Sequence, residues 1–332
     1  MHSQLFKTPY FNLEVKSNQS ELIQRISYDL NMLTQKTGGD LNLRVEVFIG
    51  ESAPLLLKGS RFYFLTRKAK IYQREMMRRI VYRDGAQIEF DYRNEAASVW
   101  APTIDRAHDL SLQIIQSRVG KYLDKMGLHR IHACAIEYKD QAMFMMMPIG
   151  GGKSSLLLEL LKNPDVKLIS DDTPLLDHAG TLHAYPLRIG IASKPDGMNN
   201  FELPTLTRLD YGTKYLISTP FINNSISWES EKYYAIIGSP GYESSLTVVK
   251  GQVLFYRLVK EMVIGLGVPQ IVELYLEFSF IDFLRILRIL GSRMFLMLKL
   301  LLKTKKYKLV RGPSNQKNAE LIINLLDKAK TT

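Results

Sequence analysis

Alternating apolar and polar positions predict a small α/β domain in the first part of the chain. Leu41 to Ile49 alternates with the period of two that marks a strand with one buried face. Ser20 to Gln35 repeats its apolar residues with helical spacing, so a helix is expected there. Further short strands are expected at 11–15, 62–65, 69–72, 78–82 and 87–92, with a hairpin turn at Asp84-Gly85. Because this region holds no catalytic constellation, we expect residues 1–102 to act as a scaffold or recognition domain.

The pattern then predicts a connecting helix and a second, larger domain. Thr103 to Met126 has helical character, with Thr103 as its cap and Gly127 as its end, so residues 103–127 are expected to join the two domains. Strands are expected at 131–138, 143–147, 166–170, 175–176, 182–183, 187–191 and 246–254. A long irregular segment is expected at 193–230. Helices are expected between 257 and 303, with breaks at 265–269 and Gly291, and again at 315–329. The second domain is therefore expected to span residues 128–332.

The apolar helical region between 257 and 303 has two interpretations. Its apolar residues fall on all helix faces, which favours packing inside the protein. The alternative, which we favour less, is a helix that contacts a membrane surface or a partner. No uncharged apolar run reaches about 18 residues, so no transmembrane helix is expected. The N-terminus lacks the apolar stretch of a signal peptide, and Cys134 is the single cysteine, which together predict a cytoplasmic protein.

Charge is concentrated near the C-terminus. The chain carries a formal net charge of +11, and residues 285–311 contain nine basic and no acidic residues. Lys303 to Lys308 is expected to be a solvated run, because it has one interleaved aromatic residue and belongs to no recognisable nucleic-acid module. We therefore expect no nucleic-acid partner.

A glycine-rich stretch between a predicted strand and a predicted helix carries the candidate chemistry. Gly150, Gly151 and Gly152 leave a backbone whose N–H groups can curl around an anion, and the helix that follows presents its positive end to the same place. Lys153 adds a cation for the outer phosphates, and Ser154, followed by Ser155, adds a hydroxyl that can ligate Mg²⁺. The stretch fits the phosphate-binding motif G-x-x-x-x-G-K-[ST] except that Met147 occupies the first glycine position. The alternative is a glycine-rich turn that only caps a helix.

Two adjacent carboxylates, Asp171 and Asp172, follow the next predicted strand. A nucleotide kinase needs oxygen ligands for Mg²⁺ and a carboxylate that orients an acceptor hydroxyl and takes its proton. A simple turn at the end of a strand would explain the pair equally well if the glycine loop were absent. Together, the two motifs predict a site for ATP and Mg²⁺.

Residues 129–192 resemble the HPr kinase/phosphorylase family. The resemblance rests on the strand from Ile131-His132, the loop Gly150-Gly-Gly-Lys-Ser154 and the run Leu168-Ile-Ser-Asp-Asp172. It implies a catalytic domain of the phosphoenolpyruvate-carboxykinase-like type, beside a smaller N-terminal α/β domain. It also implies that His132 belongs to the nucleotide site. Without the resemblance, His132 would be interpreted equally well as a histidine of the core. The family's hexamer implies self-association. The family's glycine-rich segment with a catalytic arginine has no clear equivalent here.

These features lead to a functional expectation with named roles. The chain is expected to be a serine kinase that transfers the ATP γ-phosphoryl group to a hydroxyl, with Asp171 as proton acceptor and Asp172 and Ser154 as metal ligands. The roles of the two aspartates are exchangeable. Arg188 is a candidate phosphate contact, or otherwise an ordinary exposed strand arginine. The resemblance implies a serine of a small protein or of a ribosomally made peptide, such as a lasso-peptide precursor, as the acceptor.

Two other functions stay open. The chain could bind nucleotide as a regulatory or assembly protein without phosphoryl transfer, which the departure at Met147, Pro148 and Ile149 favours. It could also phosphorylate a small molecule.

Overall fold

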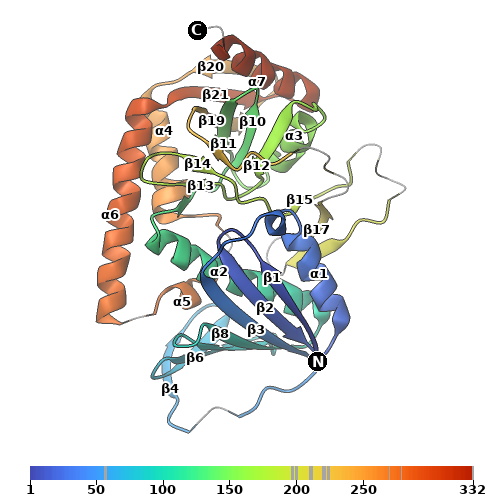
Figure 1. Cartoon of the computed structure of the whole chain (residues 1–332), viewed down its shortest axis with the longest axis vertical. Coiled ribbons are helices and arrows are strands. Elements are labelled where there is room, and N and C mark those ends of the chain that lie inside the picture. The colour runs from blue at the N-terminus through green and yellow to red at the C-terminus, as the bar shows by residue number, and fades with distance from the viewer. Residues whose placement is uncertain are drawn as a thin grey trace. The chain divides into compact units, whose positions relative to one another are not determined.

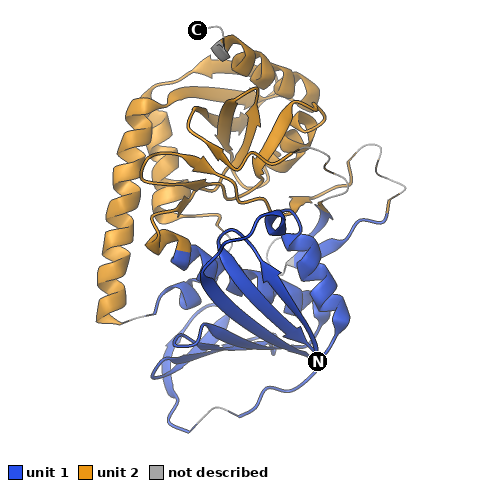
Figure 2. Cartoon of the chain, in the orientation of Figure 1, with its two compact units in different colours: residues 1–122, 202–216, 269–278 blue, residues 123–201, 217–268, 279–332 orange. Residues whose placement is uncertain are grey.

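Two large β-sheets, each in its own unit, organise a mixed α/β structure. The computed structural model describes residues 1–330 apart from 56–57, 196–197, 199–200, 209–211, 219–221, 223–224, 269 and 278. Unit 1 comprises residues 1–122, 202–216 and 269–278, and unit 2 comprises 123–201, 217–268 and 279–332 (Figure 2). The sequence predicted a continuous domain from residue 128 onward, whereas two later segments group with unit 1.

Unit 1 is built on an eight-stranded sheet with the order β1-β2-β3-β8-β7-β6-β5-β4. Its strands are β1 (His2–Lys7), β2 (Phe11–Ser17), β3 (Leu41–Ile49), β4 (Arg61–Leu65), β5 (Ala69–Arg74), β6 (Met77–Tyr82), β7 (Gln87–Asp91) and β8 (Ala96–Ala101). β2, β3 and β8 run parallel, and the other neighbours are antiparallel. The helices are α1 (Ser20–Leu30), which packs on β1 and β2, and most of α2 (Ile104–Lys125). The two later segments add β16 (Thr205–Arg208), most of β17 (Gly212–Ile217) and α5 (Val272–Tyr275).

The predicted alternation of β3 and the predicted ends of α2 are confirmed. Leu43, Val45 and Val47 of β3 are buried, while Asn42 and Arg44, which alternate with them, are exposed. Thr103 Oγ1 accepts a hydrogen bond of 3.3 Å from the Arg106 N–H, as a helix cap does. Gly127 adopts a φ of 78°, the left-handed conformation that ends a helix.

Three elements of unit 1 differ from the prediction. The helix expected at 20–35 ends at Leu30, and only a 3₁₀ turn forms at Leu33–Gln35. β1 was not predicted because it is an edge strand that buries Phe6 alone. β8 was not predicted because it lies between β3 and β7 and is mostly buried, so its residues do not alternate.

Unit 2 contains a six-stranded sheet with the order β12-β10-β11-β19-β21-β20. Its strands are β10 (Cys134–Tyr138), β11 (Gln141–Met146), β12 (Val166–Ser170), β19 (Tyr233–Pro240), β20 (Ser245–Val248) and β21 (Lys305–Arg311). β11, β19 and β21 are parallel, and the remaining neighbours are antiparallel. A smaller sheet has the order β18-β14-β13-β9, with β9 (His129–Arg130), β13 (Leu175–Leu176), β14 (Leu182–His183) and β18 (Glu229–Ser230). β15 (Ile189–Ile191) follows β14 in the chain.

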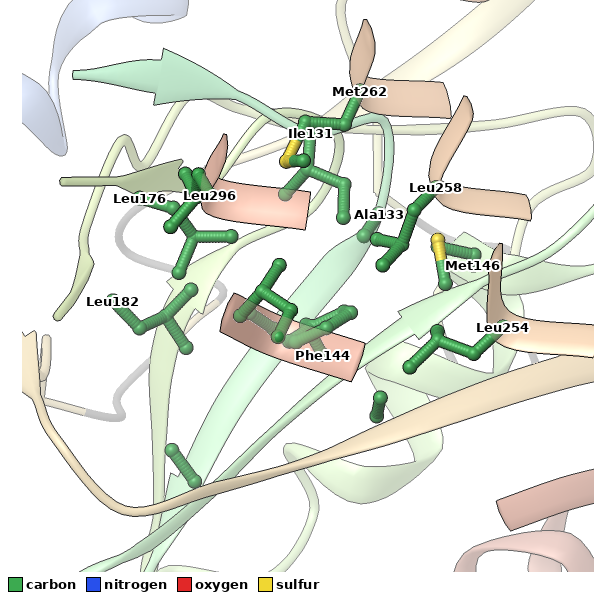
Figure 3. Packing of buried hydrophobic residues seen from close by; sticks show 14 of the residues in the cluster. Ile131, Ala133, Phe144, Met146, Leu176, Leu182, Leu254, Leu258, Met262 and Leu296 are labelled. Atoms are coloured by element: carbon green, nitrogen blue, oxygen red, sulfur yellow. The ribbon is translucent and has the colours of Figure 1, made fainter. Parts of the chain in front are cut away.

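Helices cover the six-stranded sheet on both sides (Figure 1). α3 (Lys153–Leu160) and α7 (Asn315–Lys330) contact each other and the strands of one side. α4 (Gly251–Leu258), a π-helical turn (Val259–Ile264) and α6 (Phe280–Lys303) share a core cluster with the other side. In that cluster Phe144 and Met146 of β11 pack with Leu254 and Leu258 of α4 and with Leu296 of α6 (Figure 3). This packing anchors β11, the strand that enters the glycine loop.

Several predicted elements of unit 2 need correction. The strand expected at 246–254 is two elements, β20 and α4, and Gly291 does not break α6. The basic run at 303–308 belongs mostly to β21, which pairs with β19 and β20, and its lysines at 303, 305 and 308 are exposed, as expected. The excursion expected at 193–230 contains β16, β17 and β18, and part of it lies outside the described residues, as does residue 269 of the predicted break at 265–269.

The expected core packing of α6 is confirmed on one face only, because the helix is not buried on all sides. Ile289, Leu296, Met297 and Leu300 are buried, but nine large apolar side chains of the same helix are exposed. Among the described residues, no helix is long and apolar enough to cross a membrane.

Candidate active site

The glycine loop connects β11 to α3 with two residues in the left-handed conformation. Gly150 and Gly152 have φ values of 76° and 85°, which side chains rarely allow, and Gly152 directly precedes α3. The Gly151 N–H donates a 2.9 Å hydrogen bond to the Pro148 carbonyl and closes the turn. Met147, which departs from the motif, is buried against Gly238 of β19, where a Cβ would collide with its side chain. The departure is therefore accommodated by a glycine on the neighbouring strand.

The loop residues meet the two carboxylates that follow β12. Lys153 Nζ donates a 2.6 Å hydrogen bond to Asp172 Oδ1, and Ser154 Oγ donates one of 2.8 Å to Asp171 Oδ1. Gly190 of β15 adds a backbone N–H at 3.4 Å from Asp171 Oδ2. The two motifs that the sequence singled out are thus brought together by the adjacency of α3 and the end of β12.

His132 joins this cluster from the segment between β9 and β10. Its Nε2 lies 3.5 Å from Asp172 Oδ1, and its Nδ1 lies 2.9 Å from Glu261 Oε2. The backbone also connects the two elements, because the His132 N–H donates to the Glu261 carbonyl at 3.0 Å. A Cβ at Gly267 would collide with the imidazole, so the ring is held closely on that side. The imidazole therefore bridges two carboxylates.

Sequence reasoning missed Glu261, which lies in the π-helical turn Val259–Ile264. Its side chain is 3% exposed, and its second oxygen lies 3.8 Å from Arg257 Nη1. Single wide turns of this kind occur frequently at functional sites. The available signal was a single carboxylate next to Lys260, between two apolar stretches, Leu258-Val259 and Met262-Val263-Ile264.

Burial and neighbouring charges shift the pKa values of these groups in different directions. Burial and the adjacent Asp172 carboxylate raise the pKa of Asp171. Burial opposes ionisation of Asp172 as well, but the Lys153 cation and the His132 hydrogen bond outweigh it and hold the pKa of Asp172 well below its ordinary value. Burial lowers the pKa of His132, yet its bonds to Asp172 and Glu261 raise it on balance. The pair thus separates into an ionised Asp172 and an Asp171 with a higher affinity for a proton.

Lys153 stays charged for the same reason. Burial alone would lower the pKa of its ammonium group, but the carboxylates of Asp172 and Asp171 raise it. A buried cation that is paired with a carboxylate at the end of a glycine loop can exchange that partner for a phosphate oxygen.

Arg311, at the end of β21, is a second residue that sequence reasoning did not select. A Cβ built on Gly152 would lie 2.5 Å from the Arg311 guanidinium carbon, so the guanidinium rests on the loop. Its Nη2 donates a 2.7 Å hydrogen bond to Asn315 Oδ1 at the start of α7. Parallel β11, β19 and β21 end at the same edge of the sheet, which explains how a residue from the basic C-terminal segment reaches the loop.

Two other predicted site residues, Arg188 and Ser155, lie close in sequence to elements of this cluster. Arg188 is half-buried immediately before β15, the strand that supplies the Gly190 N–H. Ser155 lies in the first turn of α3 and is exposed. Within the described part of the chain, no group of three or more His, Cys, Asp and Glu residues is arranged to hold a metal ion.

A second buried cluster in unit 2 has the residue types of a hydrolytic triad. His129 Nδ1 lies 2.9 Å from Asp124 Oδ1, and His129 Nε2 is hydrogen-bonded to Ser292 Oγ. Arg293 Nη2 also donates a 2.7 Å bond to Asp124. Ser292 lies inside α6, where the surrounding backbone N–H groups are committed to helix hydrogen bonds and cannot stabilise an oxyanion. We therefore interpret the cluster as a structural link between α2, β9 and α6.

A comparison with known protein families and a search of curated proteins find no match for this chain.

Proposed function

We propose that the chain is an ATP-dependent kinase that transfers the γ-phosphoryl group to a hydroxyl acceptor. The observation that carries the proposal is the meeting of the glycine loop with the carboxylate pair, Lys153 with Asp172 and Ser154 with Asp171. Phosphoryl transfer depends mainly on positioning and on electrostatic stabilisation, and this cluster combines a phosphate-binding backbone, a cation and two carboxylates.

Nucleotide binding would use the loop and the cations around it. The N–H groups at the start of α3 and the positive end of that helix suit the phosphates. Lys153 would exchange Asp172 for a phosphate oxygen, and Arg311 would reach the same phosphates from the end of β21. Both cations belong to unit 2, as does the loop.

The residues fit a magnesium ion bound together with the nucleotide. Mg²⁺ prefers oxygen ligands and commonly takes one or two from the protein and the rest from phosphates and water. Ser154 Oγ and the Asp172 carboxylate, which is held ionised, are oxygen donors of this type. When bound, the ion would neutralise charge on the phosphates.

The proton of the acceptor hydroxyl would pass to Asp171. As the hydroxyl oxygen forms its bond to the γ-phosphorus and the bond to ADP breaks, the hydroxyl loses a proton to an Asp171 oxygen. Burial and Asp172 raise the pKa of Asp171, which makes it a better base than an ordinary aspartate. His132, bridged to Glu261, would hold Asp172 in position.

The resemblance of residues 129–192 to HPr kinase/phosphorylase extends the proposal to the fold and the acceptor. We infer a phosphoenolpyruvate-carboxykinase-like catalytic domain and a serine of a small protein or ribosomally made peptide as acceptor. The buried, single Cys134 supports a reducing, cytoplasmic setting.

A regulatory nucleotide-binding protein is the second candidate. It is favoured by Met147, Pro148 and Ile149, which replace the small and polar residues usual in such loops. In this second case the chain would bind Mg-ATP through the same groups but would not transfer the phosphoryl group.

Incubation with γ-labelled ATP separates the two candidates. If the chain is a kinase, label should appear on a peptide, protein or metabolite acceptor, or ATP should be hydrolysed slowly without one. Asp171→Asn should then slow this reaction by roughly 10²–10⁴-fold. Binding of Mg-ATP by calorimetry with no transfer or hydrolysis would support the regulatory reading instead.

A further inference from the structure

Helix α6 presents a continuous apolar stripe to solvent, on the side opposite to its packed face. The stripe consists of Phe280, Leu284, Leu287, Gly291, Met294 and Leu298, which advance by four or three residues and therefore share one face. Phe295 and Leu302, which are 62% and 86% exposed, widen it. A Cβ built on Gly291 meets no atom within 4 Å, so the centre of the stripe is open.

The neighbouring helix α4 also exposes apolar side chains. α4 and α6 contact each other and bury their inner residues in the same core cluster (Figure 1). Tyr256 of α4 is 70% exposed, and Val253 one turn earlier is exposed as well. Unit 2 thus exposes apolar side chains on two helices that contact each other. One of these side chains is a tyrosine, a residue enriched where proteins meet a membrane interface.

The charges beside the stripe are of one sign. Arg288, Arg285 and Lys303 are exposed along one flank of α6. The only acidic residue of the helix, Asp282, is 2% exposed. The stripe therefore combines an uncovered apolar band with exposed cations beside it, and α6 has no exposed carboxylate of its own.

We propose that the α6 face binds the surface of a membrane that contains anionic lipids. Membrane-surface helices combine an apolar face, which enters the headgroup boundary, with flanking Lys and Arg that attract anionic headgroups. A second copy of the chain is the weaker candidate, because an antiparallel pair of α6 helices would bring cationic flank against cationic flank.

The geometry suits a helix that lies on the membrane and does not cross it. α6 has 24 residues, which corresponds to a length of about 36 Å. Its inner face remains in the core through Leu296 and Leu300. Only the outer stripe would therefore enter the lipid. The proposal is independent of the phosphoryl-transfer reaction.

Vesicle co-sedimentation of the full chain tests the proposal. The probes are vesicles of phosphatidylcholine alone and of phosphatidylcholine mixed with phosphatidylglycerol. We expect binding to the mixed vesicles, much weaker binding to phosphatidylcholine, and a steep loss with added salt. The double variant Arg288→Glu/Lys303→Glu should bind at least tenfold more weakly, since each cation near an anionic surface is worth roughly fivefold in affinity. Phe295→Ser/Leu298→Ser should also lose at least about tenfold, through the apolar contribution.

Matched controls change similar residues elsewhere. Tyr242→Ser removes a 98% exposed aromatic side chain from the turn between β19 and β20, and Lys317→Glu reverses an exposed charge on α7. Both should bind like wild type. The proposal is overturned if wild type fails to bind mixed vesicles, or if the α6 variants and the controls bind alike. A dimer in solution that Phe295→Ser/Leu298→Ser dissociates, without vesicle binding by wild type, would assign the stripe to a second copy.

Discussion

The guanidinium of Arg311 rests on Gly152 so closely that any side-chain carbon at Gly152 would lie 2.5 Å from it. Gly152, the last residue of the glycine loop, and Arg311, the last residue of β21, are therefore in direct contact. Gly152 is required there twice, once for its φ of 85° and once for the space that the arginine fills.

This contact predicts that Arg311 binds phosphate. Arg311→Gln should weaken Mg-ATP binding by about tenfold or more, since a charge-assisted hydrogen bond contributes roughly 1.5–3 kcal/mol. Isothermal calorimetry measures the affinity. Lys308→Gln, on the same strand and exposed, is the matched control and should bind ATP normally. Equal losses in both variants would argue for a general charge effect and against a contact at the loop.

Lys153→Ala is expected to weaken Mg-ATP binding by about tenfold or more. The change removes the buried ammonium group that would move from Asp172 to a phosphate. Lys162→Ala removes a lysine near the other end of α3, where it pairs with Glu159, and should leave binding unchanged. Circular dichroism checks that both variants fold. A folded Lys153→Ala protein with wild-type affinity would contradict the assignment.

The two aspartates should respond differently to the same substitution. Asp171→Asn preserves size but cannot take a proton, so turnover should fall by roughly 10²–10⁴-fold with little change in ATP affinity. Asp172→Asn should instead alter the Mg²⁺ or Mn²⁺ concentration that half-maximal activity requires. Transfer assays beside calorimetry distinguish these outcomes. If Asp171→Asn turns over like wild type, Asp171 is not the base.

Glu261 is expected to help keep His132 protonated. The hydrogen bonds to Asp172 and Glu261 raise the pKa of His132 above its ordinary value of 6.5, so the imidazolium should persist to higher pH than in a free histidine. Glu261→Gln removes one negative partner, and the deprotonation midpoint should move to lower pH. NMR of ¹⁵N-histidine-labelled protein follows the titration, with His132→Gln to identify the resonance.

The control for this titration is Glu159→Gln, which changes a carboxylate that pairs with Lys162 on α3. The His132 midpoint should be the same in this variant as in wild type. An unchanged midpoint in Glu261→Gln would mean that the observed 2.9 Å contact has no electrostatic effect on the imidazole.

Asp124 should make the stability of the protein depend on acid pH. Burial opposes its ionisation, but Arg293 and His129 lower its pKa to about 2 from an ordinary value of 3.8. The ionised carboxylate therefore contributes about 2 kcal/mol to the unfolding free energy above pH 4, and this contribution is lost as the pH falls toward 2.

Urea denaturation at several pH values measures this contribution. Asp124→Asn should be less stable than wild type at neutral pH. The difference should narrow as the pH falls from 4 toward 2, because the unfolded chain takes up a proton on Asp124 first and the native carboxylate is protonated only near its lowered pKa. Asp165→Asn, at an exposed position, is the control, and its unfolding free energy should equal that of wild type at every pH. A difference that stays constant with pH would contradict the depressed pKa.

The part of the site that could be predicted consists of residues that are close together in the sequence. Four elements follow one another in the sequence: β11, the glycine loop, α3 and β12. Their order and spacing made it possible to select Lys153 and Asp171 as candidate site residues. Unit 2's strands next to the loop were also largely predictable, because apolar runs of that length form buried strands.

The missed residues reach the site through tertiary pairing. Arg311 arrives because β21 pairs in parallel with β19, and nothing in the basic composition of residues 305–311 reveals that pairing. Glu261 arrives because the π-helical turn packs on His132, 129 positions away in the chain. The exposed face of α6 was misjudged because a helix with apolar residues all round resembles a buried helix until its neighbours are known.

The position of Cys134 at the start of β10 makes its thiol a probe for the local opening of unit 2. Its thiol is completely buried, and burial raises its pKa to about 12, so it is shielded from alkylating reagents while β10 stays in the sheet. It is also the only cysteine of the sequence. The rate of maleimide labelling therefore reports how often this strand becomes accessible, and a ligand that binds the folded site slows that rate in proportion to its occupancy. Nucleotide binding can thus be followed without a substrate, a product or a tag.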